Sequence, residues 1–181
     1  MLTIRQARES DCAAMCDIHR AAIVHHYSPT HGEETARKWA SMFRTGVCEE
    51  WLASGMMIVA EEPSSLLGFA QFDGDTGDIE ICVLPEAEKR AIASALLAVI
   101  EAEARTRGLD SLHLCAMLNS ERLYIPSGFA GAGVGTMTLS SDACLPCIKM
   151  EKLLQYTEPR TERRHTARVG SEVDLDGGTD A

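Results

Sequence analysis

The stretch that decides the fold runs from Asp78 to Gly108 and reads DIEICVLPEAEKRAIASALLAVIEAEARTRG. Its first part, up to Leu84, is typical of a strand. From Glu86 to Arg107 apolar side chains recur at helical spacing, and the glycine that follows is a common helix stop. The sequence therefore predicts a strand, a short loop and a long helix in succession. The loop would present unpaired helix amides and the positive end of the helix dipole, which suit a phosphate.

Strand-like and helix-like segments continue to alternate on both sides of this stretch. Period-two patterns and runs of strand-forming residues predict further strands at residues 2–7, 56–62, 66–72, 111–117, 128–139 and 147–154. Helical spacing predicts helices at residues 12–23, 33–43 and, as a short element, 121–127. A polar stretch at residues 25–32 contains Pro29 and is expected to separate the first two helices. The alternation predicts an α/β domain.

The composition is that of a globular protein with an acidic balance. The chain has 181 residues, of which 45% are hydrophobic and 24% are charged, and its net charge is −10 at pH 7. Because binding to nucleic-acid phosphates needs a basic face, this balance argues against a nucleic-acid partner. It favours cationic small molecules or basic peptides instead. No segment has the roughly 18 consecutive apolar residues of a membrane span, so we expect no membrane association.

Seven cysteines are spread along the chain, and the first five residues contain no apolar signal-peptide core. An odd number of cysteines without an export signal predicts reduced thiols in a cytoplasmic protein. Cys144 and Cys147 have the spacing of metal and redox sites, but no second pair accompanies them, so we interpret them as incidental or buried thiols and expect no metal. Cys82 and Cys115 are expected to pack within strands as small apolar side chains.

Two segments together resemble the Gcn5-related N-acetyltransferase (GNAT) family. One is the loop and helix from Val83 to Leu97, and the other is NSERLYIPSGF from Asn119 to Phe129, whose spacing of Asn, Tyr, Gly and Phe is similar to a motif of that family. The segment CIKMEK at 147–152 looks like the family's closing strand. The resemblance covers about residues 2–154. It implies a mixed, mostly antiparallel sheet with helices on both faces, with the cofactor entering where the strands at 78–84 and 111–117 diverge.

The phosphate-binding loop departs from the family's pattern. The resemblance implies a Gln or Arg followed by glycines, whereas this chain has EKRAIA from Glu88 to Ala93. Glu88 and the β-carbons of the alanines are expected to weaken pyrophosphate binding, although each alanine should strengthen the helix relative to glycine. Lys89 and Arg90 offer charge-assisted hydrogen bonds in compensation. The residues expected to bind the cofactor here are Glu88, Lys89, Arg90, Ala91, Ile92, Ala93 and Ser94.

The resemblance implies that Tyr124 protonates the departing CoA thiolate. A phenol with a pKa of about 10 can donate to a thiolate whose conjugate acid has a pKa of about 8.5. Asn119 would bind the pantetheine arm or a nearby carbonyl. The structural alternatives are a tyrosine that packs beside Gly128 and Phe129, and an asparagine that only forms a turn.

The strand at 78–84 would hold the pantetheine amides through the backbone of Ile81, Cys82 and Val83, and one amide there would stabilise the oxyanion of the tetrahedral intermediate. Two acids on this strand, Asp78 and Glu80, could deprotonate an ammonium acceptor directly or through water. We take Glu80 as the candidate base. A solvated acid on a strand surface is the alternative for each of them.

Aromatic and histidine residues in the first two helical segments fall where the family builds its variable acceptor pocket. Tyr27, after His25 and His26, and Trp39 are therefore candidate substrate contacts. A surface loop and a core tryptophan are the alternatives. His19 lies on the apolar stripe of the first helix and is interpreted as a core histidine with satisfied hydrogen bonds.

The domain is expected to end at residue 154. Residues 155–181 hold four Arg and six acidic residues with almost no large apolar side chain, which predicts a disordered charged tail. The expected function is transfer of acetyl from acetyl-CoA to a primary amine of a cationic small molecule or peptide, by direct attack. The alternative, favoured by Glu88, Ala91 and Ala93, is a degenerate acyl-CoA-binding or interaction module without turnover. The sequence is compatible with a homodimer and selects no particular acceptor.

Overall fold

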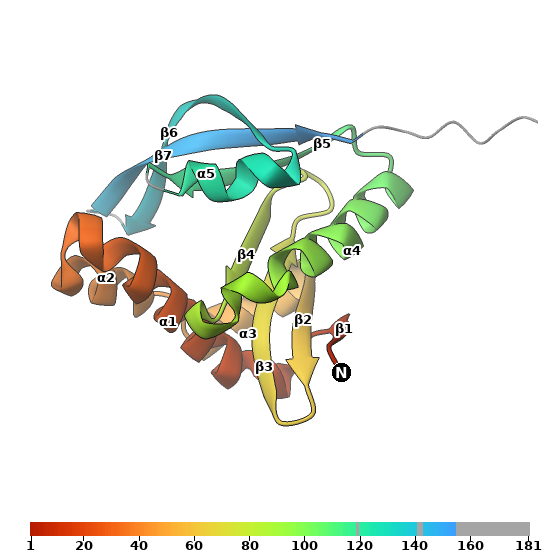
Figure 1. Cartoon of the computed structure of the whole chain (residues 1–181), viewed down its shortest axis with the longest axis horizontal. Helices are drawn as coiled ribbons and strands as arrows, with labels where there is room; N and C mark the ends of the chain where they lie inside the picture. Colours follow the sequence, from red (N-terminus) through yellow and green to blue (C-terminus); the bar gives the residue numbers. More distant parts are fainter. Residues whose placement is uncertain (119, 141–142, 155–181) are drawn as a thin grey trace, which may run out of the picture.

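The described strands form two antiparallel sheets, which meet at β4 (Figure 1). The computed structural model describes residues 1–118, 120–140 and 143–154, so Asn119 and the expected tail at 155–181 lie outside the described residues. The strand orders are β1-β2-β3-β4 and β5-β7-β6. In chain order the strands are β1 (Thr3–Gln6), β2 (Met56–Glu62), β3 (Ser65–Phe72), β4 (Ile79–Val83), β5 (Ser111–Met117), β6 (Ala130–Ser140) and β7 (Ala143–Leu153).

The two sheets are joined where β4 begins. Asp78 forms an isolated parallel bridge with His113 of β5, whereas the strand pairs inside each sheet are antiparallel. The arrangement is therefore mixed and mostly antiparallel, as expected. The sheet divides at this point because β4 and β5 diverge after the bridge.

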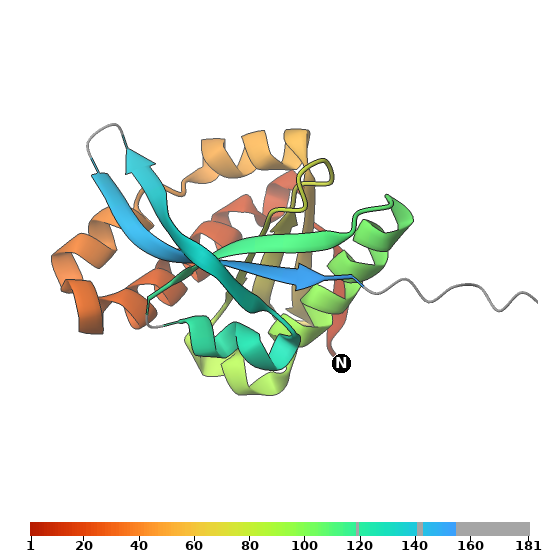
Figure 2. The ribbon, with the colours of Figure 1, turned by 90° about the horizontal axis from the view of Figure 1, so that it is seen from above.

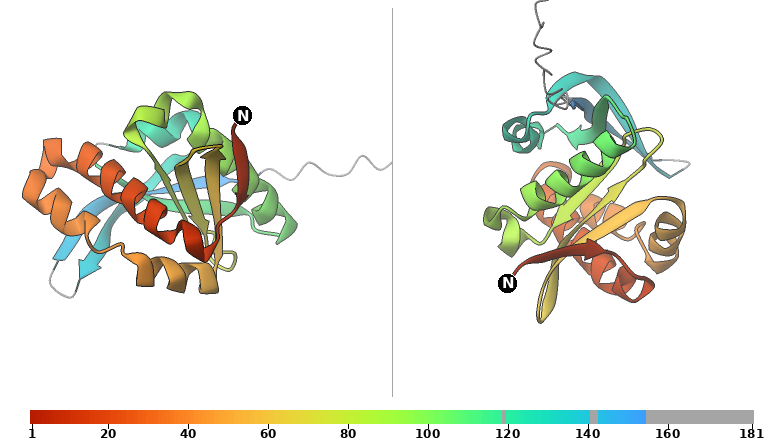
Figure 3. Two further views of the ribbon diagram at one scale, coloured as in Figure 1. Left: turned by 90° about the horizontal axis from the view of Figure 1, so that it is seen from below. Right: turned by 90° about the vertical axis from the view of Figure 1, so that its right-hand side faces the viewer.

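Helices cover both faces of the first sheet, which confirms this part of the expected fold (Figure 3). On one face lies α4 (Ile92–Thr106). On the other lie α1 (Cys12–His31) and α3 (Thr45–Ser54). The shorter α2 (Glu33–Ala40) packs beside α1 and near the ends of β6 and β7 (Figure 2). Among the described residues, no helix combines the length and the apolar character needed to cross a membrane.

The alternation of side chains along the strands separates two buried clusters. Ile58 of β2 packs with Leu96 of α4, whereas its neighbour Val59 packs with Met15 of α1 and with Phe43. Successive strand residues point to opposite faces, so one short apolar strand supplies both layers of the core. The sheet is thereby fixed between the helices that flank the candidate site.

The helical region before β2 differs from the expected one. The polar stretch at 25–32 is not a separate loop, because α1 continues through Pro29 to His31 and is capped by Gly32, whose φ is 80°. The burial of Tyr27 against the second helix stabilises the last turns and outweighs the local preference of proline. The helix α3 had no counterpart among the expected elements, although Val47 and Trp51 stand four residues apart, as on a helix face.

The long helix expected from Glu86 to Arg107 is interrupted near its start. Residues Pro85–Arg90 form a 3-10 helix, η2, and α4 begins only at Ile92. Between them Ala91 adopts φ 57° and ψ 20°, which is a left-handed conformation that glycine adopts far more easily than alanine. The expectation that alanine strengthens the helix at this position is therefore wrong, because Ala91 precedes the helix.

The cysteines do not all stay reduced, contrary to expectation. Cys12 at the start of α1 and Cys48 in α3 form a disulfide, with Cα atoms 5.7 Å apart. Packing of the two helices brings together residues separated by 36 positions. The cysteine count consequently no longer argues for a reducing compartment. Cys82 is buried, as expected, whereas Cys115 is exposed, which corrects the prediction that it packs as a small apolar residue.

Candidate active site

A pocket of about 760 Å³ opens where β4 and β5 diverge. The two strands are held together at one end, where the His113 N–H donates to the Gly77 carbonyl at 2.9 Å beside the Asp78 bridge. Beyond it, β4 pairs with β3 while β5 pairs with β7. The pocket is lined from β4, from α1 and α2, from the start of α4 and from the short α5 (Glu121–Tyr124). It combines residues from both halves of the chain.

Hydrogen bonds to β3 determine which backbone groups of β4 face the gap. The Asp78 carbonyl accepts from the Asp73 N–H, and the Leu84 N–H donates to the Leu67 carbonyl, both at 2.9 Å. Because antiparallel pairing alternates along a strand, the even-numbered residues bond to β3 and the odd-numbered ones point away. The backbone of Cys82 is therefore directed to β3. Among the three expected backbone contacts, Ile81 and Val83 have their N–H and C=O groups on the open edge.

Glu80 projects into the pocket from the middle of β4. Its carboxylate accepts a hydrogen bond from the Cys82 thiol at 3.7 Å, and its side chain is 36% exposed. Loss of hydration in the pocket raises the pKa of Glu80 to about 7, and the Cys82 hydrogen bond opposes this only partly. Asp78, the other acid considered, instead accepts from the Thr76 hydroxyl at 2.9 Å in an exposed turn.

His19 lies beside Glu80 as a neutral ring. Its Nε2 is 3.6 Å from a Glu80 carboxylate oxygen, which exceeds the usual length of a hydrogen bond. Burial lowers the pKa of His19 to about 4, so the pair carries no opposite charges at neutral pH. His19 is buried as expected, but its Nδ1 has no partner among the described residues, which corrects the expectation that its hydrogen bonds are satisfied. A partly exposed acid that has lost hydration in the pocket, and that has no cationic partner among the described residues, is a good proton acceptor once it is ionised.

Tyr124 lines the same pocket from the side of α5. Burial raises the pKa of its hydroxyl well above the ordinary value, with smaller contributions from Cys82 and Glu80. Burial also raises the pKa of Tyr27 of α1, with contributions from Tyr124, Cys82 and Glu80. The two phenols therefore stay protonated at neutral pH. Both phenols line the pocket together with Glu80 and Cys82, so these groups converge there.

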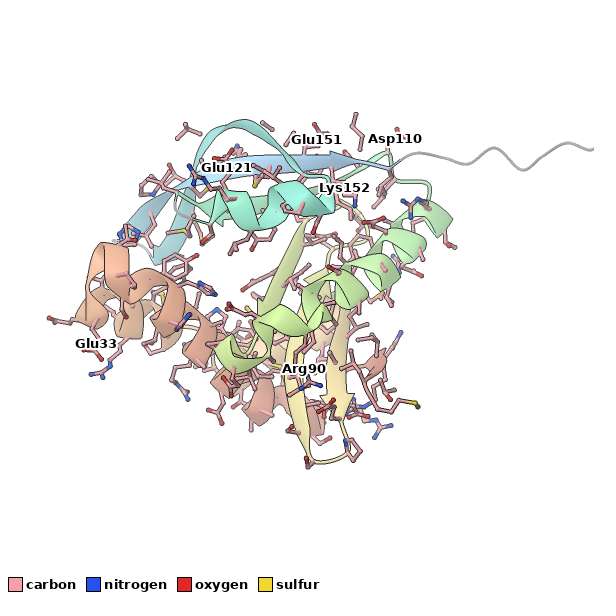
Figure 4. All side chains as sticks on the ribbon, in the orientation of Figure 1. Glu33, Arg90, Asp110, Glu121, Glu151 and Lys152 are labelled. Carbon is pink, nitrogen blue, oxygen red and sulfur yellow. A yellow bond between two sulfur atoms is a disulfide. The ribbon has the colours of Figure 1, made fainter. Side chains whose placement is uncertain are left out.

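The short segment that carries Tyr124 is anchored from two directions. Lys152 of β7 donates to the Ser127 carbonyl and forms an ion pair with Glu101 of α4, both at 2.5 Å (Figure 4). The ring of Phe129 packs edge-on against Tyr124, with centroids 6.2 Å apart. Gly128, with φ 88°, provides the left-handed turn between the anchor and the following strand. These contacts give Tyr124 a defined position.

The start of α4 presents backbone amides and small side chains to the pocket. The first intrahelical acceptor is the Ala91 carbonyl, which receives the Ala95 N–H at 3.0 Å. The amides of the preceding first-turn residues have no acceptor within the helix. Ala91, Ala93 and Ser94 line the pocket, whereas the Ile92 side chain is buried in the core and leaves only its backbone for binding.

The charged residues of η2 are arranged differently from the sequence-based expectation. Glu88 lines the pocket and forms a 2.6 Å hydrogen bond with His26 Nε2 of α1, so it connects the two sides of the opening. Arg90 forms an ion pair with Glu62 at the end of β2 and does not line the pocket (Figure 4). Lys89 belongs to the same 3-10 helix.

Aromatic residues form the pocket wall opposite α4. Tyr27 and Trp39, the candidate substrate contacts, both line it, and their rings pack edge-to-face with centroids 4.1 Å apart. Phe43 and Trp51 extend this wall, with their rings 4.8 Å apart. Sequence reasoning missed both, because neither belongs to a motif. The four-residue spacing of Val47 and Trp51 on an unrecognised helix was the available signal.

Comparisons with known proteins place the chain in a family. The profile of the acetyltransferase (GNAT) family matches residues 20–137, which is well over half of the chain. The protein therefore belongs to the acetyltransferase (GNAT) family, and the class of activity that this membership supports is N-acetyl transfer. No curated protein matches the sequence.

Solved structures share the whole fold. A GCN5-related N-acetyltransferase from Rhodopseudomonas palustris is 22% identical with a TM-score of 0.76, over 84% of this chain and 95% of that one. The paia N-acetyltransferase of Thermoplasma acidophilum, solved with coenzyme A, is 16% identical with a TM-score of 0.72, over 84% and 99%. The yncA protein of Salmonella typhimurium, solved with acetyl-CoA, is 21% identical with a TM-score of 0.59, over 89% and 99%. At these identities the likeness concerns the fold.

Proposed function

We propose that the protein transfers an acetyl group from acetyl-CoA to a primary amine by direct attack, with Glu80 as the general base and Tyr124 as the general acid. The observation that carries the proposal is that both side chains line one pocket at the divergence of β4 and β5, in a chain of the acetyltransferase family. A base for the amine and an acid for the leaving thiolate are the two groups that this reaction requires.

The donor fits the side of the pocket formed by β4 and the start of α4. Free first-turn amides and the helix dipole suit the pyrophosphate, and the small side chains of Ala91, Ala93 and Ser94 leave the backbone accessible. The backbone groups of Ile81 and Val83 on the open edge of β4 would hold the pantetheine amides. One of these N–H groups is also suited to stabilise the oxyanion.

Two groups of the site would exchange protons with the substrates in the proposed reaction. A primary ammonium must lose a proton before its nitrogen can attack, and Glu80, whose pKa is about 7, accepts that proton near neutral pH. The nitrogen attacks the thioester carbon. As the tetrahedral intermediate collapses, the carbon–sulfur bond breaks, and the nitrogen's second proton and the proton held by Glu80 pass to solvent. The thiolate takes a proton from the hydroxyl of Tyr124, which then recovers a proton from solvent. In total, an amide, the free thiol of CoA and one proton leave the site.

The alternative without turnover has a specific observation in its favour. Glu88 places a carboxylate in the pocket on the element before α4. Two observations weigh against it. Glu88 is hydrogen-bonded to His26, and Ala91 keeps the left-handed conformation suited to the glycine of the family's pattern. The shape of the loop is therefore compatible with donor binding although its side chains differ.

Calorimetry and a thiol-release assay test the proposal together. The protein is titrated with acetyl-CoA, and CoA release is then followed with a mixture of primary amines. We expect saturable binding and release of CoA that depends on the amine. Binding without release would favour the non-catalytic alternative. Absence of binding would overturn both functions.

A further inference from the structure

The walls of the acceptor side of the pocket indicate which amine the protein accepts. We define the acceptor lobe as the part of the pocket lined by Tyr27, Trp39, Met42, Phe43, Val47 and Trp51, which come from α1, α2, α3 and the segment before α3. We propose that the acceptor is a primary amine with a single positive charge, an apolar body of about the size of an aromatic ring, and no carboxylate. This inference rests on the proposed function, because it describes the second substrate of the same reaction.

The number of acidic side chains in the pocket lining argues for a single positive charge on the acceptor. Among the described residues that line the pocket, the only acids are Glu80 and Glu88. Glu88 lies in η2 on the donor side, where it is hydrogen-bonded to His26. Of the described lining residues, Glu80 is thus the one carboxylate next to the acceptor lobe. A second ammonium group would lose hydration among apolar walls, and aromatic faces would replace only part of what it loses.

The basic groups argue against a carboxylate on the acceptor. Among the described lining residues there is no lysine or arginine, and the only basic side chains are His19 and His26. His19 is neutral at neutral pH because burial lowers its pKa to about 4. His26 is engaged with Glu88. A free amino acid would place its carboxylate near Glu80 without a cationic partner, which is unfavourable in a pocket of low polarity.

The aromatic walls are rigid and favour a flat apolar body. Trp39 and Phe43 are only 9% and 4% exposed, so their rings are held by the core. The rings of Phe43 and His19 pack 4.8 Å apart, which connects the aromatic wall to the residue beside Glu80. The pocket, at about 760 Å³, has room for the end of the donor and a small acceptor. An amine that reaches Glu80 therefore leaves its remaining atoms against aromatic faces.

Two matched pairs of amines test the charge argument on the unmodified protein. Phenylalanine differs from phenethylamine by a carboxylate, and 1,6-diaminohexane differs from hexylamine by a second ammonium group. We expect kcat/KM at saturating acetyl-CoA to be at least about a hundredfold higher for phenethylamine than for phenylalanine, and about tenfold higher for hexylamine than for the diamine. A tetrapeptide with N-terminal alanine should react more slowly than phenethylamine. The reverse order in either pair, or a preference for the peptide, would overturn the inference and leave the proposed function standing.

A substitution in the lobe provides a second test. Val47 is half-buried in the lining, so Val47→Glu adds a second acid there, and Val47→Gln is the uncharged control of the same size. The glutamate variant should raise kcat/KM for the diamine relative to hexylamine by about tenfold, while the glutamine variant should keep the original order. Equal ratios in the two variants would contradict the inference. If acetyl-CoA binds but no amine in the panel reacts, the proposed function fails and this inference fails with it.

Discussion

The two walls of the pocket are built from different parts of the chain and by different means. The donor wall consists of the edge of β4 and the first turn of α4, where backbone groups and small side chains face the pocket. The acceptor wall consists of large side chains from α1, α2, α3 and the segment before α3, and the Cys12–Cys48 disulfide connects α1 with α3. A wall of backbone groups tolerates alanine in place of glycine at position 91, because the backbone keeps the same conformation there. The shape of a wall built from side chains depends on the individual residues, because each substitution changes the surface that the substrate meets.

The largest effect is expected at Tyr124 of α5, an element that lines the pocket and belongs to neither wall. Tyr124→Phe removes the proposed proton donor and should lower kcat by about 10²–10⁴-fold, while the dissociation constant of acetyl-CoA stays nearly unchanged. Steady-state kinetics with an acceptor whose chemical step limits the rate, together with calorimetry, measure both quantities. Tyr27→Phe is the matched control, since Tyr27 lies on the acceptor wall, and it should change mainly KM for the amine. A normal kcat in folded Tyr124→Phe would remove this residue from the mechanism.

The next largest effect is expected on the pH dependence of activity, through Glu80 of β4. The base must be ionised to act, so kcat/KM of the unmodified protein should rise as the pH increases through about 7, the raised pKa of Glu80. Glu80→Gln should lower kcat/KM at pH 7 by about a hundredfold, and the deficit should shrink at higher pH as free amine becomes abundant. Asp78→Asn is the control, because that carboxylate lies in an exposed turn. An identical pH profile in Glu80→Gln and the unmodified protein would assign the base elsewhere.

Glu80→Gln should also change the pH dependence of stability. A carboxyl group whose pKa is higher in the folded than in the unfolded state binds more protons when folded, so its contribution to stability declines as the pH rises from about 4.5 to about 7. The Gln variant should lose this decline. Thermal unfolding at pH 5 and pH 8 measures this decline. An equal change of Tm between the two pH values in both proteins would contradict the raised pKa of Glu80.

The disulfide of the acceptor wall should contribute a smaller effect, mainly on stability. Cys48→Ser opens a loop of 36 residues, and loops of this size are stabilised by about 2–4 kcal/mol when closed. For a chain of this length the loss corresponds to a Tm lower by about 5–15 °C. KM for the amine should rise more than the dissociation constant of acetyl-CoA. A reductant should lower the Tm of the unmodified protein and leave Cys48→Ser unchanged. If the reductant lowers both equally, the bond does not stabilise this wall.

The smallest effect is expected on the donor wall, at Ala91. Relief of the left-handed conformation favours glycine by about 1–2 kcal/mol, and the greater entropy of the unfolded chain offsets about 0.4–1 kcal/mol of this. Ala91→Gly should therefore stabilise the protein by about 0.5–1 kcal/mol and leave acetyl-CoA binding equal or slightly tighter. Ala98→Gly, on the exposed face inside α4, should instead destabilise it by about 1 kcal/mol. Chemical denaturation of both variants measures the difference, and the same sign of change in both would show that Ala91 is not strained.

Local sequence patterns predicted most strands correctly. The prediction for the helical region before β2 was partly wrong. The strand at 111–117 matches β5, where Leu112, Leu114 and Ala116 are buried and alternate with less buried neighbours. The last turns of α1 and the whole of α3 were missed because their packing partners, among them Trp39 and Phe43, come from other segments. The turn at Ala91 was missed for a different reason, since alanine is the residue that most favours a continuous helix. Only the path of the surrounding chain requires the left-handed conformation there.

The sequence by itself determined the class of fold, the resemblance to the acetyltransferase family and the place of the loop between β4 and α4, because these depend on periodicity and on motifs whose members are close along the chain. The tertiary structure decided what the site contains. It brought His19 beside Glu80, connected His26 to Glu88, and paired Cys12 with Cys48. It also set the pKa of Glu80 near 7 by burial. These properties depend on distances between residues far apart in the sequence and on their shared loss of water, which no local pattern encodes.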